Sequence, residues 1–124
     1  MKRSLILFSA AATLVFSSAA FAQTAPVKKA DGILVNSAGM TVYTFDKDVA
    51  DSGKSTCNGP CATAWPPVAV GDAKLAAPYS VVTRDDGAKQ VAYKGKPLYL
   101  FVSDTKAGDR NGDKVKEVWH VVKD

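Results

Sequence analysis

The stretch V-Y-T-F-D-K-D at Val42–Asp48 has a close copy further along the chain, L-Y-L-F-V-S-D at Leu98–Asp104. Both copies read Tyr-x-Phe-x-x-Asp, and each follows a glycine by the same step, Gly39 in the first copy and Gly95 in the second. A pattern that recurs at a fixed distance is typical of a duplicated structural unit. We therefore expect the fold to consist of two similar halves.

The repeat extends beyond these two stretches. A shift of 56 residues superimposes the aromatic strands, whereas a shift of 54 superimposes the tryptophans, so the loop of the second half is two residues shorter. Each half reads as a glycine turn, an aromatic strand that ends in aspartate, a polar loop and a tryptophan-led segment. The recurring residues are Tyr43, Phe45, Asp48 and Trp65 in the first half and Tyr99, Phe101, Asp104 and Trp119 in the second.

One half alone is too small to bury its aromatic side chains, whereas two halves packed against each other could do so. The sequence therefore predicts an all-β fold, a small sandwich or barrel built from two pseudo-symmetric repeats. β-prone runs separated by turn residues predict hairpins. We expect a helical turn at most near residues 61–65, because Pro66-Pro67 stops it. The expected hairpins pair 33–35 with 40–45 and 79–83 with 89–93, and further strands are expected at 97–101 and 118–122.

The first residues have the features of a secretory signal peptide. Lys2 and Arg3 precede an apolar run at 5–16, and Ala20-Phe21-Ala22 supplies the small residues that a signal peptidase needs. The apolar run is shorter than the about 20 residues that span a bilayer. We expect cleavage after Ala22, a periplasmic or secreted location, and no transmembrane segment in the mature chain.

The expected domain organisation follows from this cleavage. Residues 1–22 form the signal peptide, and residues 23–31 read as a flexible N-terminal lead-in because they are polar and show no periodicity. Residues 32–124 form a single β domain, with repeat one at about 32–70 and repeat two at about 79–122. The computed net charge of +4 includes Lys2 and Arg3 and falls to +2 in the mature chain, with the lysines scattered. This charge does not favour nucleic acid as a partner.

The two cysteines, Cys57 and Cys61, are expected to form a disulfide with each other, since an exported protein folds in an oxidising compartment. The residues between them, Asn58-Gly59-Pro60, are typical of a tight turn, which allows the chain to reverse direction. A redox-active dithiol is the alternative. The three-residue spacing and the missing strand-helix-strand context make that alternative the weaker one.

The repeated aromatic residues have two interpretations. As core residues, Tyr43, Phe45, Tyr99 and Phe101 would pack between the halves, and as a ligand platform they would present their rings to solvent. We favour the core. Asp48 and Asp104 follow the aromatic strands, where a carboxylate can accept hydrogen bonds from the backbone amides of a turn. The alternative is a pair of acids that share a catalytic or metal site across the pseudo-symmetry axis.

We predict no metal, no cofactor and no catalytic residue. The acidic run Asp109–Asp113 fails as a calcium loop, because Lys114 stands where the loop needs glycine and His120 where it needs glutamate. His120 is the only histidine, and with the cysteines bonded no transition-metal set of useful spacing remains. The sequence contains no hydrolase nucleophile motif and no phosphate-binding glycine loop.

Several motifs together resemble a known family. These are the doubled Tyr-x-Phe-x-x-Asp, the Cys-x-x-x-Cys followed by Trp65-Pro66-Pro67, the turn at Thr83–Gly87, and the ending from Gly108-Asp109 to Val122. They resemble the bacterial secreted-repeat family described as putative lipoproteins with a Yx(FWY)xxD motif, from about Gly32 to Val122. The resemblance implies an exported, often envelope-associated small protein with no established catalytic residues. The chain lacks a lipobox cysteine.

From these observations we expect an exported, non-enzymatic envelope or periplasmic protein, a binding or structural module whose partner is an unknown envelope component or a small ligand. The first alternative is an enzyme or a disulfide/redox accessory protein that uses Cys57 and Cys61, or the paired Asp48 and Asp104. A second alternative, suggested by the acidic turns, is a calcium- or metal-dependent adhesin-like module.

Overall fold

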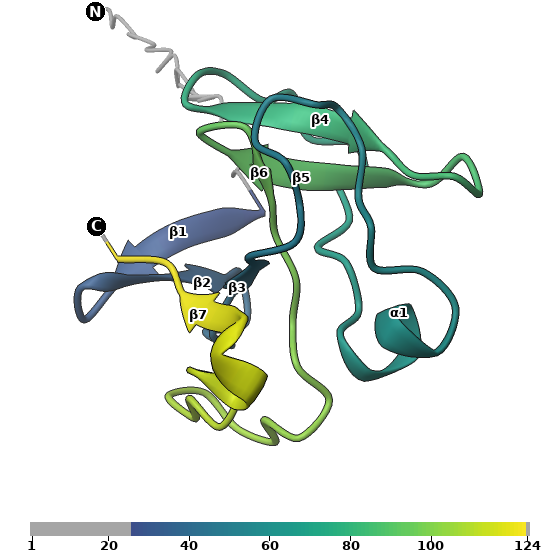
Figure 1. The fold of residues 1–124 in the computed structure, drawn as a ribbon. Helices are drawn as coiled ribbons and strands as arrows, with labels where there is room; N and C mark the ends of the chain where they lie inside the picture. Colours follow the sequence, from purple (N-terminus) through teal and green to yellow (C-terminus); the bar gives the residue numbers. More distant parts are fainter. Residues whose placement is uncertain (1–25, 124) are drawn as a thin grey trace, which may run out of the picture.

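The structure is a computed structural model that describes residues 26–123. The expected signal peptide at 1–22 and the first part of the expected lead-in lie outside these residues. The described chain is all-β, with one short helix, α1 (Pro60–Ala64), and one 3-10 turn, η1 (Val115–Glu117). Figure 1 shows short strands connected by long loops.

The strands form three small antiparallel sheets. β1 (Val27–Ala30) pairs with β2 (Ile33–Asn36), and β3 (Tyr43–Phe45) pairs with β7 (Trp119–Val121). The third sheet has the order β4 (Tyr79–Thr83), β5 (Lys89–Tyr93), β6 (Lys96–Pro97). Isolated bridges connect these sheets, and within residues 26–123 they do not close into a barrel.

Strand β1 corrects one expectation. Residues 27–30 were expected to belong to a flexible lead-in, but they pair with β2 along its whole length, from Val27 opposite Asn36 to Ala30 opposite Ile33. Val27 is buried in the core. Sequence periodicity missed this strand because two of its four residues, Lys28 and Lys29, face solvent and leave a pattern too short to recognise.

Other expected elements agree closely with the structure. The hairpin of 79–83 with 89–93 has the expected bounds, and α1 lies within one residue of the expected helical turn. The closing strand is β7, at 119–121. The expected hairpin of 33–35 with 40–45 is only partly formed, since β2 reaches the following segment through a single bridge between Val35 and Thr41.

The two repeats meet at Tyr43 and Tyr99. These residues form an antiparallel bridge in which each backbone N–H donates to the other's carbonyl, at 2.8 Å and 2.9 Å. Because the two tyrosines occupy equivalent positions in the repeats, this bridge lies on the pseudo-two-fold axis. β3 therefore has β7 on one side and the strand-like segment around Tyr99 on the other.

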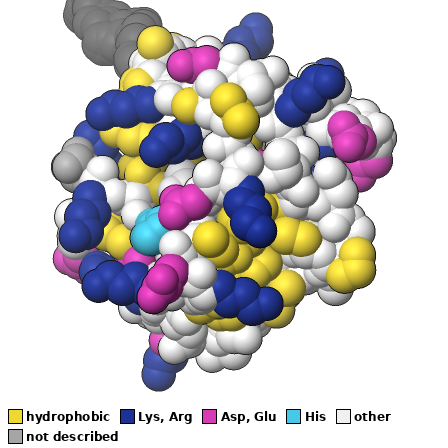
Figure 2. Space-filling view, viewed as in Figure 1, with side chains coloured by type: hydrophobic (Ala, Val, Ile, Leu, Met, Phe, Trp, Pro, Cys, Tyr) yellow, Lys and Arg dark blue, Asp and Glu magenta, His cyan; other side chains and the backbone are white. Residues whose placement is uncertain are grey.

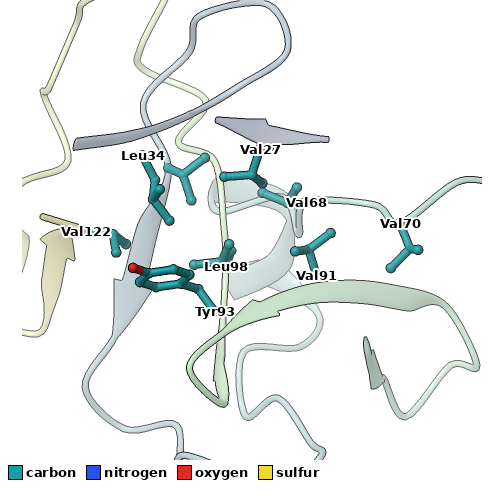
Figure 3. Close-up of a cluster of buried hydrophobic side chains, with 9 residues drawn as sticks. Val27, Leu34, Val68, Val70, Val91, Tyr93, Leu98 and Val122 are labelled. Carbon is teal, nitrogen blue, oxygen red and sulfur yellow. The ribbon is translucent and has the colours of Figure 1, made fainter. Parts of the chain in front are cut away.

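Buried side chains form two clusters. The first is mostly aliphatic and joins residues from both repeats (Figure 3), namely Val27, Leu34, Val42, Val68, Val70, Val91, Tyr93, Leu98 and Val122. The second cluster contains most of the repeated aromatic residues together with Cys57 and side chains from β2 and β7. Val42 and Tyr43 belong to different clusters because consecutive residues of a strand point to opposite faces. The aromatic strands therefore separate two cores.

Candidate functional site

The tyrosine of each repeat binds the aspartate of the other. The Tyr43 hydroxyl donates to Asp104 Oδ2 at 2.6 Å, and the Tyr99 hydroxyl donates to Asp48 Oδ2 at 2.5 Å. We call these two contacts the crossed Tyr–Asp pairs. Each pair joins residues more than fifty positions apart in the chain. The motif Tyr-x-Phe-x-x-Asp thus works between the copies rather than within one copy.

The second oxygen of each carboxylate holds the loop that follows it. Asp48 Oδ1 accepts from the backbone N–H and the hydroxyl of Thr56, both at 2.7 Å, and Asp104 Oδ1 accepts from the backbone N–H of Asn111 at 2.9 Å. We expected the carboxylates to cap a local turn. The amides that they bind lie eight and seven residues further on, so they close whole loops.

Burial and charge keep both tyrosines protonated. Tyr43 and Tyr99 are fully buried, Asp104 is buried and Asp48 is half-buried. Burial, reinforced by the hydrogen bond to the neighbouring carboxylate, raises the pKa of each tyrosine hydroxyl well above its usual value near 10. No hydrogen bond joins Asp48 to Asp104 in the described part of the chain. At neutral pH each pair is a fixed donor and acceptor.

Four aromatic rings form a continuous stack across the axis, in the order Phe45, Trp119, Trp65, Phe101. The two indoles at its centre are 3.7 Å apart and nearly parallel, and each is covered on its outer face by the phenylalanine of the other repeat, at 4.2 Å and 4.0 Å. Tyr43 meets Trp65 edge to face, and Tyr99 meets Trp119 in the same way. The stack obeys the pseudo-two-fold symmetry throughout.

The stack largely decides whether the repeated aromatic residues are core residues or a platform for a ligand. Trp65 and Trp119 are buried, with 6% and 3% of their surface exposed, and Phe45 and Phe101 are half-buried. Every indole face is occupied by another ring, so only ring edges remain for solvent or a ligand. The rings are mainly core residues that show their edges at one surface.

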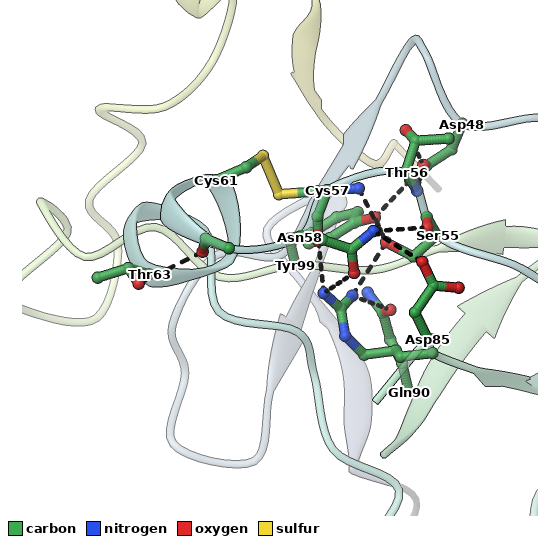
Figure 4. Close-up of a disulfide and its surroundings, with 12 residues drawn as sticks. Asp48, Ser55, Thr56, Cys57, Asn58, Cys61, Thr63, Asp85, Gln90 and Tyr99 are labelled. Atoms are coloured by element: carbon green, nitrogen blue, oxygen red, sulfur yellow. Dashed lines mark hydrogen bonds between the residues drawn. A yellow bond between two sulfur atoms is a disulfide. The ribbon is translucent and has the colours of Figure 1, made fainter. Parts of the chain in front are cut away.

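Cys57 and Cys61 form a disulfide that joins the loop after β3 to α1 (Figure 4). Cys57 is fully buried and Cys61 half-buried. Arg84, which is 5% exposed, donates to the Cys57 carbonyl, to Asn58 Oδ1 at 3.2 Å, and to Ser55 Oγ at 2.9 Å. A buried guanidinium thus fixes the disulfide loop through hydrogen bonds to neutral oxygens.

Arg84 also connects this loop to a crossed Tyr–Asp pair. Ser55 Oγ accepts from Arg84, which leaves its own proton for the Tyr99 hydroxyl 2.5 Å away, and Tyr99 donates in turn to Asp48. Gln90, fully buried, accepts from Arg84 at 2.8 Å and donates to the Leu98 carbonyl at 2.7 Å. Nothing in the sequence marks Ser55, Arg84 and Gln90 as members of a network, because polar residues beside a turn usually face solvent.

The remaining polar candidates hold turns. Asp109 Oδ2 accepts from the backbone amides of Thr105 and Lys106 at 2.9 Å and 3.2 Å, and the hydrogen bond from Thr105 is the main reason that the pKa of Asp109 is lowered. His120 Nε2 lies 2.9 Å from Asp46 Oδ2 at the surface, which pairs β7 with the end of β3. Within residues 26–123, no three His, Cys, Asp or Glu side chains are grouped so as to hold a metal ion.

One surface hollow borders the ring stack, and we call it the stack groove. It has a volume of about 390 Å³, within the range of small-molecule sites. In Figure 2 hydrophobic side chains gather between α1 and η1, with Lys or Arg side chains at the border. The groove is lined by Phe45, Lys47, Pro60, Cys61, Ala64, Trp65, Val115, Lys116, Val118 and Trp119.

The chain was compared with known protein families, curated proteins and solved structures. Residues 25–69 and 80–123 each match the family described as a secreted repeat of unknown function. The two matches cover more than half of the chain, so the protein belongs to this family of secreted repeats, in agreement with the resemblance found in its motifs. No curated protein and no solved structure matches the chain. None of the helices within residues 26–123 is long and apolar enough to cross a membrane.

The crossed Tyr–Asp pairs predict a specific loss of stability. Tyr43→Phe removes the hydrogen bond that the hydroxyl donates to the buried Asp104 carboxylate and the one that it accepts from the Gly112 N–H. We therefore expect the free energy of unfolding to fall by about 1.5–3 kcal/mol. Tyr93→Phe is the matched control, because its ring is also buried but its hydroxyl makes no hydrogen bond with any described residue; its expected change is within about 0.5 kcal/mol. Urea denaturation measures both values, and equal losses would contradict the assignment.

The raised tyrosine pKa values predict weaker stability at alkaline pH. Tyrosines of the unfolded chain ionise near pH 10, whereas Tyr43 and Tyr99 stay protonated in the fold. Their stabilising effect is therefore complete below pH 10 and declines as the pH rises above it, by up to about 1.4 kcal/mol per pH unit for each tyrosine. The measurement is the slope of unfolding free energy against pH between about pH 9.5 and 11. The Tyr43→Phe/Tyr99→Phe variant should have a clearly shallower slope, and an unchanged slope would refute the prediction.

Proposed function

We propose that the protein is an exported, non-enzymatic module of the cell envelope that binds a small ligand or another envelope component through the stack groove. The observation that carries the proposal is the groove itself. It is an apolar hollow of ligand size, and it opens on the line where the two repeats meet. Membership in a family of secreted repeats supports the exported location.

The interior polar groups support a scaffold role for the repeated motif. Both oxygens of Asp48 and of Asp104 already accept hydrogen bonds, and both tyrosines are protonated donors. Acid–base work at neutral pH would need a group that gains and loses a proton there and that reaches a substrate. The tyrosines of the crossed Tyr–Asp pairs are buried and stay protonated, and both oxygens of each aspartate are already bound, so the proposal assigns the pairs to holding the groove in shape.

The same helix provides a test with a matched control. Ala64 lines the groove, whereas Ala62 borders a different hollow near Arg84 and Asp85. Ligands found by a thermal-shift screen, or envelope components recovered by pull-down from periplasmic extract, should bind the wild-type protein and the Ala62→Leu variant alike. Ala64→Leu should weaken binding about tenfold or more, because the added side chain fills part of the hollow.

An NMR experiment checks that the two variants are folded and that the ligand binds in the groove. Amide shifts in a ¹H–¹⁵N NMR spectrum should confirm that both variants keep the wild-type fold. With ligand present, these shifts should cluster around the groove. Binding that is equally strong in both variants, or shifts that cluster elsewhere, would refute the proposal.

A redox role for Cys57 and Cys61 is the second candidate, and one observation favours it. Cys61 is half-buried and lines the groove, so the disulfide is within reach of a molecule bound there. A redox titration separates the two functions. Structural disulfides have reduction potentials below about −300 mV, and a value well above this would favour the redox role.

A further inference from the structure

We propose that the stack groove binds a flat aromatic carboxylate or related organic anion. This inference rests on the proposed function and adds the chemical class of the ligand. Three independent features of the groove carry it. They are the ring edges that line the groove, the indole N–H groups without a partner among the described residues, and two lysines that break the symmetry of the repeats.

The first feature is the row of ring edges. Because Phe45 and Phe101 cover the outer faces of the stacked indoles, Trp65 and Trp119 can meet a ligand only with their edges. Aromatic edges carry partial positive charge and ring faces partial negative charge, so edges attract the face of another aromatic ring. A flat aromatic molecule laid across this row makes the edge-to-face contacts that the stack leaves unmade.

The second feature is a pair of free donors. The indole N–H groups of Trp65 and Trp119 have no hydrogen-bond partner in the described part of the chain, although both side chains are more than nine-tenths buried. Neither nitrogen is fully sealed from solvent, because no buried side-chain nitrogen or oxygen of residues 26–123 lacks a partner. Buried indole N–H groups usually find an acceptor. An anionic oxygen of a bound ligand that reached either nitrogen would provide one.

The third feature is positive charge. Lys47 and Lys116 are the two charged residues that line the groove, and neither ammonium group makes an ion pair or hydrogen bond with any described residue. Two unpaired cations beside apolar ring edges complement a molecule with an aromatic body and an acidic group.

The symmetry of the repeats separates these lysines from the scaffold. A shift of 54 residues relates the groove residues of α1 to those near η1, pairing Cys61 with Val115, Ala64 with Val118 and Trp65 with Trp119. The apolar floor is thus a product of the duplication. The lysines are not, because Lys47 corresponds to Ser103 and Lys116 to Ala62. The two cations thus depart from the symmetry of the apolar floor.

The backbone around Lys116 is strained at the same place. Lys114, Lys116 and Glu117 all have left-handed φ angles, at 70°, 50° and 60°, although none is a glycine. Such conformations are unfavourable for residues that carry a Cβ, and they are enriched at ligand sites. The strained segment presents the Lys116 side chain at the groove wall.

The experiment uses 2-naphthoate as probe, with the whole mature protein and isothermal titration calorimetry. Two matched ligands isolate the two parts of the proposal. Naphthalene-2-carboxamide keeps the rings and loses the charge, and decanoate keeps the charge and loses the rings. We expect 2-naphthoate to bind at least tenfold more tightly than either one, with affinity that falls as salt rises.

Two variants test the lysines. Lys47→Gln/Lys116→Gln should weaken 2-naphthoate binding by about threefold to thirtyfold, the range expected for two partly exposed ion pairs. Lys54→Gln is the control, because Lys54 is exposed, lies outside the groove and forms no ion pair with any residue of 26–123. Its affinity should be unchanged. Melting temperatures close to wild type establish that each variant is folded.

The outcomes are distinguishable. Equal binding of decanoate and 2-naphthoate, or the same affinity in the double lysine variant and in Lys54→Gln, would overturn the ligand class while the groove remained a binding site. No 2-naphthoate binding up to millimolar concentration would overturn it as well. The Ala64→Leu variant, which fills the groove, tests the proposed function separately. If ligands found by the thermal-shift screen or the pull-down lose affinity in that variant, the proposed function survives and only this inference fails.

Discussion

The fold depends on the exchange of hydrogen bonds between two copies of one motif. Tyr43 binds Asp104 and Tyr99 binds Asp48, while the backbones of the two tyrosines bind each other on the axis between them. A carboxylate removed from water without a partner is costly, so each copy needs the tyrosine of the other copy to hold its half-buried or buried aspartate. This constraint makes two short repeats, each too small for a core, into one structure.

The aromatic stack follows from the same exchange. Once the tyrosines are fixed, Phe45 reaches Trp119 and Phe101 reaches Trp65, so each indole packs against the opposite repeat. The stack uses up all the indole faces and leaves edges at one surface. There, the disulfide-linked α1 and the strained turn around η1 form the walls of the stack groove. The same aromatic side chains thus stabilise the fold and line the candidate binding surface.

How much the sequence could reveal depended on whether a feature was repeated. The doubled Tyr-x-Phe-x-x-Asp indicated an all-β pseudo-symmetric fold, and the flanking turn residues gave the hairpin of β4 and β5 its bounds. The sequence could not reveal that each tyrosine binds the aspartate of the other copy. The spacing between Tyr and Asp within one copy is the same whether the aspartate binds the tyrosine of its own copy or of the other copy. Strand β1 was missed because two exposed lysines leave no apolar alternation. Arg84 was missed because its partners, Ser55, Cys57 and Gln90, converge only after the disulfide loop has folded over β5.

Native-state hydrogen exchange at Tyr43 and Tyr99 tests the central claim most directly. Their amides form the bridge between the repeats, so in a protein held together by mutual exchange they should open only when the whole chain unfolds. The account predicts that both amides exchange with the same free energy, equal to that of global unfolding measured by denaturant. If either amide exchanged at a free energy lower by about 2 kcal/mol or more, the repeats would be opening separately and the account would be wrong.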